Sequence, residues 1–192
     1  MMSIWWCAQQ NWQIGIGDPG VMGWLTVALY VATGGLALRV AARGGFAGRT
    51  AERERLFWYM LGPIMLLFAV NKQLDLQTLL TAIGRCMAQI QGWYETRRAV
   101  QIEFIAVVFV VALIVMGIMS TALRGTLRRN GMALVGLAFV LGFVAIRAAG
   151  FHRMDQLINV RFEMIRMNWV LEMTGPILIV ICGVSILRVA RT

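Results

Sequence analysis

Residues 71–77 read Asn-Lys-Gln-Leu-Asp-Leu-Gln, a polar run where a membrane-spanning helix should still be apolar. The apolar stretch before it, Leu56–Val70, makes about 22 Å of helix, whereas the hydrocarbon core of a bilayer is roughly 30 Å thick. A helix that crosses from Leu56 must therefore continue to Asp75. A charge at that depth needs a partner and often marks a functional site. The alternative is that the spanning helix is short and that the polar run is its solvent-exposed end.

The composition is typical of a membrane protein. Of 192 residues, 59% are hydrophobic and 14% are charged, and the mean hydropathy is +0.72. Soluble domains carry about 25% charged residues. We expect one membrane domain over residues 1–192. The net charge of +9 comes without a basic stripe interleaved with aromatic residues, so no nucleic-acid partner is expected.

Apolar segments of spanning length recur along the chain and predict an all-α, polytopic integral membrane protein with five transmembrane helices. They cover residues 21–38, 56–75, 104–123, 132–151 and 169–187. Two connections, 78–94 and 151–168, carry apolar residues at helical spacing. We expect both to be amphipathic helices on the outer membrane surface. Gly-Pro pairs at 62–63 and 175–176 are interpreted as kinks within two of the spans.

The distribution of arginine predicts the orientation. One side of the predicted bundle collects ten basic residues against two acidic ones, Glu52 and Glu54. Cytoplasmic loops carry such an excess. We therefore expect the N-terminus outside and the C-terminus in the cytoplasm. No basic n-region or cleavage site precedes the first span, so no cleavable signal peptide is expected. The ten residues are Arg39, Arg43, Arg49, Arg53, Arg55, Arg124, Arg128, Arg129, Arg188 and Arg191.

The length argument repeats in two further spans. Arg147 falls about one turn inside the outer border of the fourth span, and Glu172 lies at a similar depth in the fifth. Inserting a lone charge at that depth costs about 2.5–3.5 kcal/mol of free energy on membrane-insertion scales, so charges there are usually paired. We hypothesise that Arg147 bridges Asp75 and Glu172 inside the bundle, with Lys72 able to pair with Asp75 at i,i+3.

Further ionisable groups lie just outside this level. His152 and Asp155 stand at i,i+3, a spacing at which the carboxylate orients the imidazole and raises its basicity, as a general base requires. The alternative is a structural histidine at a helix start. Arg97 and Arg98 suit a phosphate or carboxylate group. No nucleophile motif accompanies them, so enzymatic activity stays open, and no metal site or cofactor is predicted.

The three cysteines have no C-x-x-C or metal-ligand spacing. Cys7 and Cys86 both fall on the predicted outer side, and the sequence leaves open whether they form a disulfide. Cys182 lies within the last apolar segment.

Several of these residues form motifs that resemble a family of small, uncharacterised bacterial inner-membrane proteins. The resemblance implies a location in the bacterial inner membrane and implies no particular activity. It covers roughly residues 55–172. The motifs are Asn71-Lys72-Gln73-Leu74-Asp75-Leu76-Gln77, then Gly92-Trp93-Tyr94-Glu95-x-Arg97-Arg98-x-x-Gln101, then Arg147-Ala148 and Phe151-His152-x-x-Asp155.

Two functions fit these features. The first is a site at the outer face that binds or processes an anionic, lipid-like substrate, with membrane lipids as partners. His152 and Asp155 would then be catalytic, and the substrate-binding residues would be Asn71, Lys72, Asp75, Arg97, Arg98, Arg147 and Glu172. The second is a non-catalytic accessory or assembly subunit of a larger membrane complex, in which the same charges hold helices and other membrane subunits together.

Overall fold

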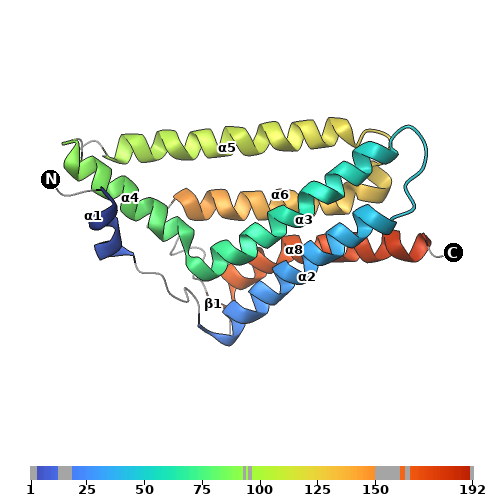
Figure 1. Ribbon diagram of the computed structural model, residues 1–192, viewed down its shortest axis with the longest axis horizontal. Helices are drawn as coiled ribbons and strands as arrows, with labels where there is room; N and C mark the ends of the chain where they lie inside the picture. The colour runs from blue at the N-terminus through green and yellow to red at the C-terminus, as the bar shows by residue number, and fades with distance from the viewer. Residues whose placement is uncertain are drawn as a thin grey trace.

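The computed structural model describes residues 4–12, 19–92, 94, 97–149, 161–162 and 165–190. The described part of the chain is helical apart from one short hairpin, which confirms the all-helical fold class (Figure 1). The elements are α1 (Ile4–Asn11), α2 (Val21–Arg43), α3 (Ala51–Leu74), α4 (Leu76–Ile90), α5 (Arg97–Ala122), α6 (Leu127–Ala149), β1 (Arg161–Phe162), β2 (Ile165–Arg166) and α8 (Met167–Val189).

Among the described residues, four helices are long and apolar enough to cross a membrane, and they coincide with four of the five predicted spans. These segments are Val21–Arg43, Ile102–Ala122, Leu127–Ala145 and Trp169–Val189. The remaining predicted span, 56–75, covers most of α3 and ends at Asp75, the residue that follows this helix. This helix is long, but its ends carry Glu52, Glu54 and Lys72, and only its middle is apolar. A fifth crossing by α3 therefore remains a prediction.

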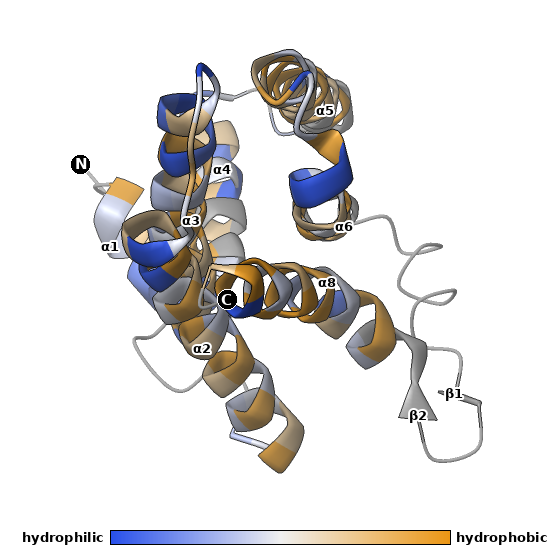
Figure 2. Cartoon of the chain, turned by 90° about the vertical axis from the view of Figure 1, so that its right-hand side faces the viewer, coloured by the Kyte–Doolittle hydropathy of each residue, from blue (hydrophilic) through white to orange (hydrophobic). Residues whose placement is uncertain are grey.

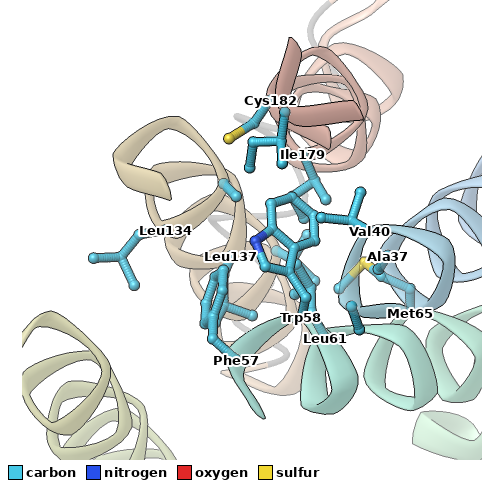
Figure 3. Packing of buried hydrophobic residues seen from close by; sticks show 14 of the residues in the cluster. Ala37, Val40, Phe57, Trp58, Leu61, Met65, Leu134, Leu137, Ile179 and Cys182 are labelled. Atoms are coloured by element: carbon cyan, nitrogen blue, oxygen red, sulfur yellow. The ribbon is translucent and has the colours of Figure 1, made fainter. Parts of the chain in front are cut away.

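The long helices pack side by side in the order α3, α2, α8, α6, α5. The core lies where the first four meet, and the fully buried Trp58 of α3 stands at its centre (Figure 3). Around its indole ring pack Val40 of α2, Leu137 of α6 and Ile179 of α8. Helix α5 lies at the edge and packs chiefly against α6 (Figure 2). None of the described side chains between Ile102 and Ala122 is buried.

Glycines allow a close approach at two helix crossings, between α2 and α3 and between α6 and α8. A Cβ added to Gly62 of α3 would lie 2.6 Å from Leu38 and 3.3 Å from the carbonyl oxygen of Gly34, both in α2. In the other pair, a Cβ on Gly136 of α6 would lie 2.7 Å from the carbonyl oxygen of Gly175 of α8. Gly62 and Gly175 are the glycines of the two Gly-Pro pairs. Small residues at these positions let the backbones approach closely, so the pairs serve helix packing.

Asp75 separates α3 from α4. Its backbone is left-handed, with φ 47° and ψ 50°, a conformation that asparagine and aspartate adopt more readily than most residues. Helix α4 turns away from the bundle at this point and packs against α1 instead (Figure 1). The amphipathic helix predicted over 78–94 is therefore confirmed as α4, which begins at Leu76 and ends at Ile90.

The second predicted surface helix, over 151–168, is wrong where the structure describes it. Arg161 pairs with Arg166, and Phe162 pairs with Ile165, in an antiparallel hairpin. Aromatic and β-branched residues such as Phe162 and Ile165 favour extended backbone, and the strand pairing satisfies their backbone groups without a helix. Residues 151–160 lie outside the described part of the chain.

Candidate functional site

Two ion pairs join distant segments of the described chain, one at each end of the helix bundle. We call these ends the Lys72 end and the Arg129 end. The C-terminal end of α3, the N-terminal ends of α5 and α8 and the C-terminal end of α6 all lie at the Lys72 end (Figure 1). The Arg129 end holds the turn between α2 and α3 and the turn between α5 and α6.

At the Lys72 end, the ammonium group of Lys72 lies 3.0 Å from Oε2 of Glu172, a residue 100 positions away. Only 11% of the Lys72 side chain and 4% of the Glu172 side chain are exposed. Lys72 comes from the last turn of α3, and Glu172 lies near the start of α8. A buried charge is tolerated when it is paired, so this contact fixes α3 to α8 at this end.

The structure places the other predicted substrate-binding residues at the same end of the bundle, but it does not show contacts that connect all of them. Asp75 accepts a 2.6 Å hydrogen bond from the Thr78 hydroxyl, and Asn71 is half-buried on α3. Arg97 and Arg98 begin α5, and Arg147 lies in the last turn of α6. The side chains of these three arginines lie outside the described part, so the bridge from Arg147 to Asp75 and Glu172 remains a prediction.

Gln73, next to Lys72, has a buried side-chain amide. Neither its oxygen nor its nitrogen has a hydrogen-bond partner. Because an unsatisfied buried amide is costly, such a group calls for a specific explanation, such as an ordered water or a bound polar group.

The predicted catalytic residues, His152 and Asp155, lie outside the described residues. Within the described ranges, no group of three His, Cys, Asp or Glu side chains is arranged to hold a metal ion.

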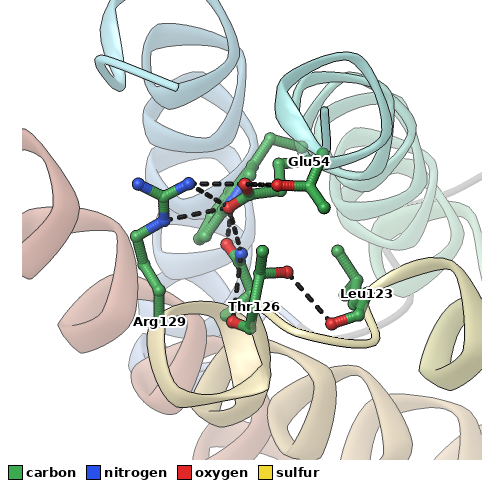
Figure 4. Close-up of polar contacts among 7 residues, drawn as sticks. Glu54, Leu123, Thr126 and Arg129 are labelled. Atoms are coloured by element: carbon green, nitrogen blue, oxygen red, sulfur yellow. Dashed lines mark hydrogen bonds and ion pairs between the residues drawn. The ribbon is translucent and has the colours of Figure 1, made fainter. Parts of the chain in front are cut away.

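At the Arg129 end lies a polar cluster formed by Glu54, Trp58, Arg129 and Asn130, which we call the Arg129 cluster. Figure 4 shows Glu54 and Arg129 within it. The Glu54 carboxylate is completely buried and accepts hydrogen bonds from Nε of Arg129 at 2.9 Å and from Nη2 at 2.5 Å. It also accepts a 2.6 Å bond from the Asn130 amide. The Asn130 oxygen in turn accepts the indole N–H of Trp58 at 2.8 Å. The Glu54 carboxylate, the Asn130 amide and the Trp58 indole N–H are therefore all hydrogen-bonded within the cluster.

Neighbouring segments complete the Arg129 cluster. The Thr50 hydroxyl donates to Glu54 at 3.1 Å, and the Arg129 guanidinium lies 5.0 Å from the centre of the Phe46 ring. The thiol of Cys182 on α8 donates to the backbone oxygen of Arg129 at 3.2 Å. The cluster therefore joins α3, α6, α8 and the 44–50 turn by charge-assisted hydrogen bonds and a cation–π contact.

The sequence did not single out the Arg129 cluster, because Glu54 lies between Arg53 and Arg55 and was interpreted as part of a polar boundary. A signal was available. Glu54 precedes Trp58 by four residues and Leu61 by seven, so all three share one helical face, and that face is buried. A carboxylate in line with a buried apolar stripe indicates an internal partner.

Two contacts fasten α1 to the Lys72 end. Cys7 forms a disulfide with Cys86 of α4, with Cα atoms 5.9 Å apart. The indole N–H of Trp12 donates to the backbone oxygen of Leu74, at the end of α3, over 3.3 Å. The disulfide that the sequence left open is therefore formed.

These observations define an all-helical protein with four helices of membrane-spanning length, held by a buried ion pair at each end of the bundle. Comparison of the chain with protein-family models, with curated proteins and with solved structures finds no match.

Proposed function

We propose that the chain is a multi-pass protein of the bacterial inner membrane, with its N-terminus outside and its C-terminus in the cytoplasm. Four helices of spanning length support insertion. The Arg129 end carries the arginine-rich turns, which fits the cytoplasmic side (Figure 2). The Cys7–Cys86 disulfide is at the opposite end, and disulfides persist in oxidising compartments such as the periplasm.

Within the membrane, the protein acts as a non-catalytic subunit of a larger complex, and α5 is its docking helix. The exposure of α5 is the observation that carries this proposal. About a third or more of the spanning segment is buried in α2, α6 and α8, whereas none of the described side chains in the spanning segment of α5 is buried. Its exposed side chains include Phe104, Phe109 and Leu113. A helix so weakly packed on its own chain is available to a neighbouring subunit.

The polar clusters support the same function. In the Arg129 cluster, Glu54, Asn130 and Trp58 are fully buried, and each is hydrogen-bonded within the chain. At the other end, the charges of Lys72 and Glu172 compensate each other. Charges arranged in this way hold helices in register, which is what a subunit needs to present a rigid surface.

The second candidate is an outer-face site for an anionic, lipid-like molecule. The specific observation in its favour is that the helix ends carrying Lys72, Arg97, Arg98 and Arg147 all face the same end of the bundle (Figure 1). Guanidinium groups bind phosphate by bidentate hydrogen bonds. His152 would supply a base if this site is catalytic.

Photo-crosslinking tests the docking helix. A crosslinking phenylalanine analogue replaces Phe109 on α5, and the control carries it at Leu67 on α3, which is similarly exposed at 65% against 55%. We expect one protein adduct of fixed mass from position 109 and none from position 67. Native mass spectrometry of the unmodified protein should show the same partner in stoichiometric amount.

Equal labelling at both positions, together with a protein that carries no partner, would contradict the subunit proposal. A retained anionic phospholipid that is lost in the double variant Arg97→Ala and Arg98→Ala would support the second candidate instead.

A further inference from the structure

Helices α1 and α4 form a unit of their own beside the bundle, which we call the outer arm (Figure 1). Helix α4 packs mainly against α1 and only slightly against α3. Among the described side chains, the buried residues of α4, which are Ala82, Cys86 and Ala88, are small, and so are Cys7 and Ala8, the buried residues of α1. The two helices therefore lie close together, with the disulfide between them.

The packing of α1 gives it two different faces. Cys7 and Ala8 are buried, whereas Trp5 and Trp6 are each 53% exposed, and Gln9 is exposed beside them. At 100° per residue, the two buried residues lie opposite the tryptophans. The outward face thus combines large indole rings with neutral polar groups. This chemistry fits the boundary between water and lipid better than either phase alone, because indole has an apolar body and a polar N–H.

The position of the arm fits the same boundary. The helix from Leu56 to Leu74 is about 28 Å long, close to the roughly 30 Å thickness of the hydrocarbon core. The end of α3 therefore lies near the border, and Trp12 bonds to the backbone oxygen of Leu74 at that level. Asp75 then turns the chain into α4, so the arm begins where the hydrocarbon ends.

We infer that the outer arm is a membrane-interface anchor: Trp5 and Trp6 lie in the headgroup layer of the outer leaflet, and the Cys7–Cys86 disulfide holds them there. This inference rests on the proposed insertion and orientation. It does not depend on a partner at α5. The disulfide closes the arm at the position next to Trp6, so the indole rings cannot move far from α4 while the bond is intact.

Fluorescence quenching in phospholipid nanodiscs tests this anchor. The emission of Trp5 and Trp6 is obtained as the difference between the native chain and the double variant Trp5→Phe, Trp6→Phe. Trp24, half-exposed in the first turn of α2 at the same end, gives a matched control through Trp24→Phe. Lipids that carry a quencher at the headgroup should quench most of the emission of Trp5 and Trp6 and most of that of Trp24. Aqueous iodide should quench little of either emission.

Removing the disulfide provides the second part of the test. In the Cys7→Ser, Cys86→Ser variant we expect the Trp5 and Trp6 emission to become accessible to iodide, while Trp24 keeps its response to lipid. Unchanged lipid quenching after opening would overturn the role of the disulfide. Circular dichroism of this variant must retain the helical signal, which separates release of the arm from unfolding.

The control residue separates the two kinds of failure. If Trp24 responds to lipid but Trp5 and Trp6 respond to iodide, the arm projects into water and the anchor is overturned while insertion stands. If Trp24 also responds only to iodide, the proposed membrane insertion itself fails. Protection of Trp5 and Trp6 from both quenchers would indicate a protein partner on the arm and would equally overturn the anchor.

Discussion

Glu54 and Arg129, 75 residues apart in the chain, form a bidentate ion pair inside the helix bundle, although Glu54 has an arginine on either side of it in the sequence. The helical period explains the choice of partner. Arg53 and Arg55 are exposed, whereas Glu54 points inward with Trp58 and reaches the start of α6. The ion pair therefore depends on the way in which α3 and α6 pack against each other.

Replacing Glu54 with Gln should destabilise the folded protein. The change removes the charge that balances Arg129 and leaves the Asn130 amide facing another donor. We expect a loss of about 3 kcal/mol in the free energy of unfolding, the lower end for a broken buried ion pair, since 39% of the Arg129 side chain is exposed. Denaturant titration in detergent micelles measures it. The exposed neighbour Glu52, changed to Gln, should behave like the native chain, and equal effects at the two sites would contradict the assignment.

The pair of Lys72 and Glu172 should show energetic coupling. Lys72→Met removes the ammonium group that pairs with the buried Glu172 carboxylate, and Glu172→Gln removes the carboxylate charge that pairs with Lys72. Each change should lower the free energy of unfolding by about 2–3 kcal/mol, by analogy with lone charges in a membrane. The double variant should lose at least about 1 kcal/mol less than the sum of the single losses, because it removes both charges together. Strictly additive losses in a double-mutant cycle would show that the contact contributes nothing specific.

The hypothesis for Arg147 predicts a third effect at the same end. If its guanidinium bridges Asp75 and Glu172, Arg147→Ala should strongly lower the melting temperature of the purified protein. Arg188→Ala, at an exposed position near the end of α8, is the control and should leave that temperature unchanged. A melting temperature for Arg147→Ala equal to that of the control would rule out the bridge.

The crossing of α6 and α8 should be sensitive to a single methyl group. In Gly136→Ala the new Cβ would meet the backbone oxygen of Gly175 at 2.7 Å, so the helices have to separate. Overpacking of this kind costs about 1–3 kcal/mol. Gly142→Ala on the same helix meets nothing within 4 Å and should be neutral or gain up to about 1 kcal/mol from helix propensity. Thermal unfolding of both variants checks the difference, and a stable Gly136→Ala protein would refute the close crossing.

The sequence by itself determined the helices and the end of the molecule at which the polar run lies. Segment length and apolar content predicted four helices of membrane-spanning length that the structure has, and helical spacing predicted α4, because these properties belong to single segments. It also predicted that Lys72 and Glu172 lie at a similar depth in the membrane, since a helix rises by a fixed distance per residue. The hairpin at 161–166 shows the limit of this reasoning: a short apolar pattern fits a helix, yet strand pairing satisfies the same residues.

Only the tertiary structure decided which of these groups meet. Lys72 pairs with Glu172, Glu54 pairs with Arg129, and Cys7 bonds to Cys86, and each contact joins segments far apart in the chain. Spacing along one helix fixes the face on which a residue lies, but not the helix that packs against that face. The neighbour is set by the close approach at glycines such as Gly136 and Gly175, by the turn at Asp75, and by the requirement that every buried charge finds a partner.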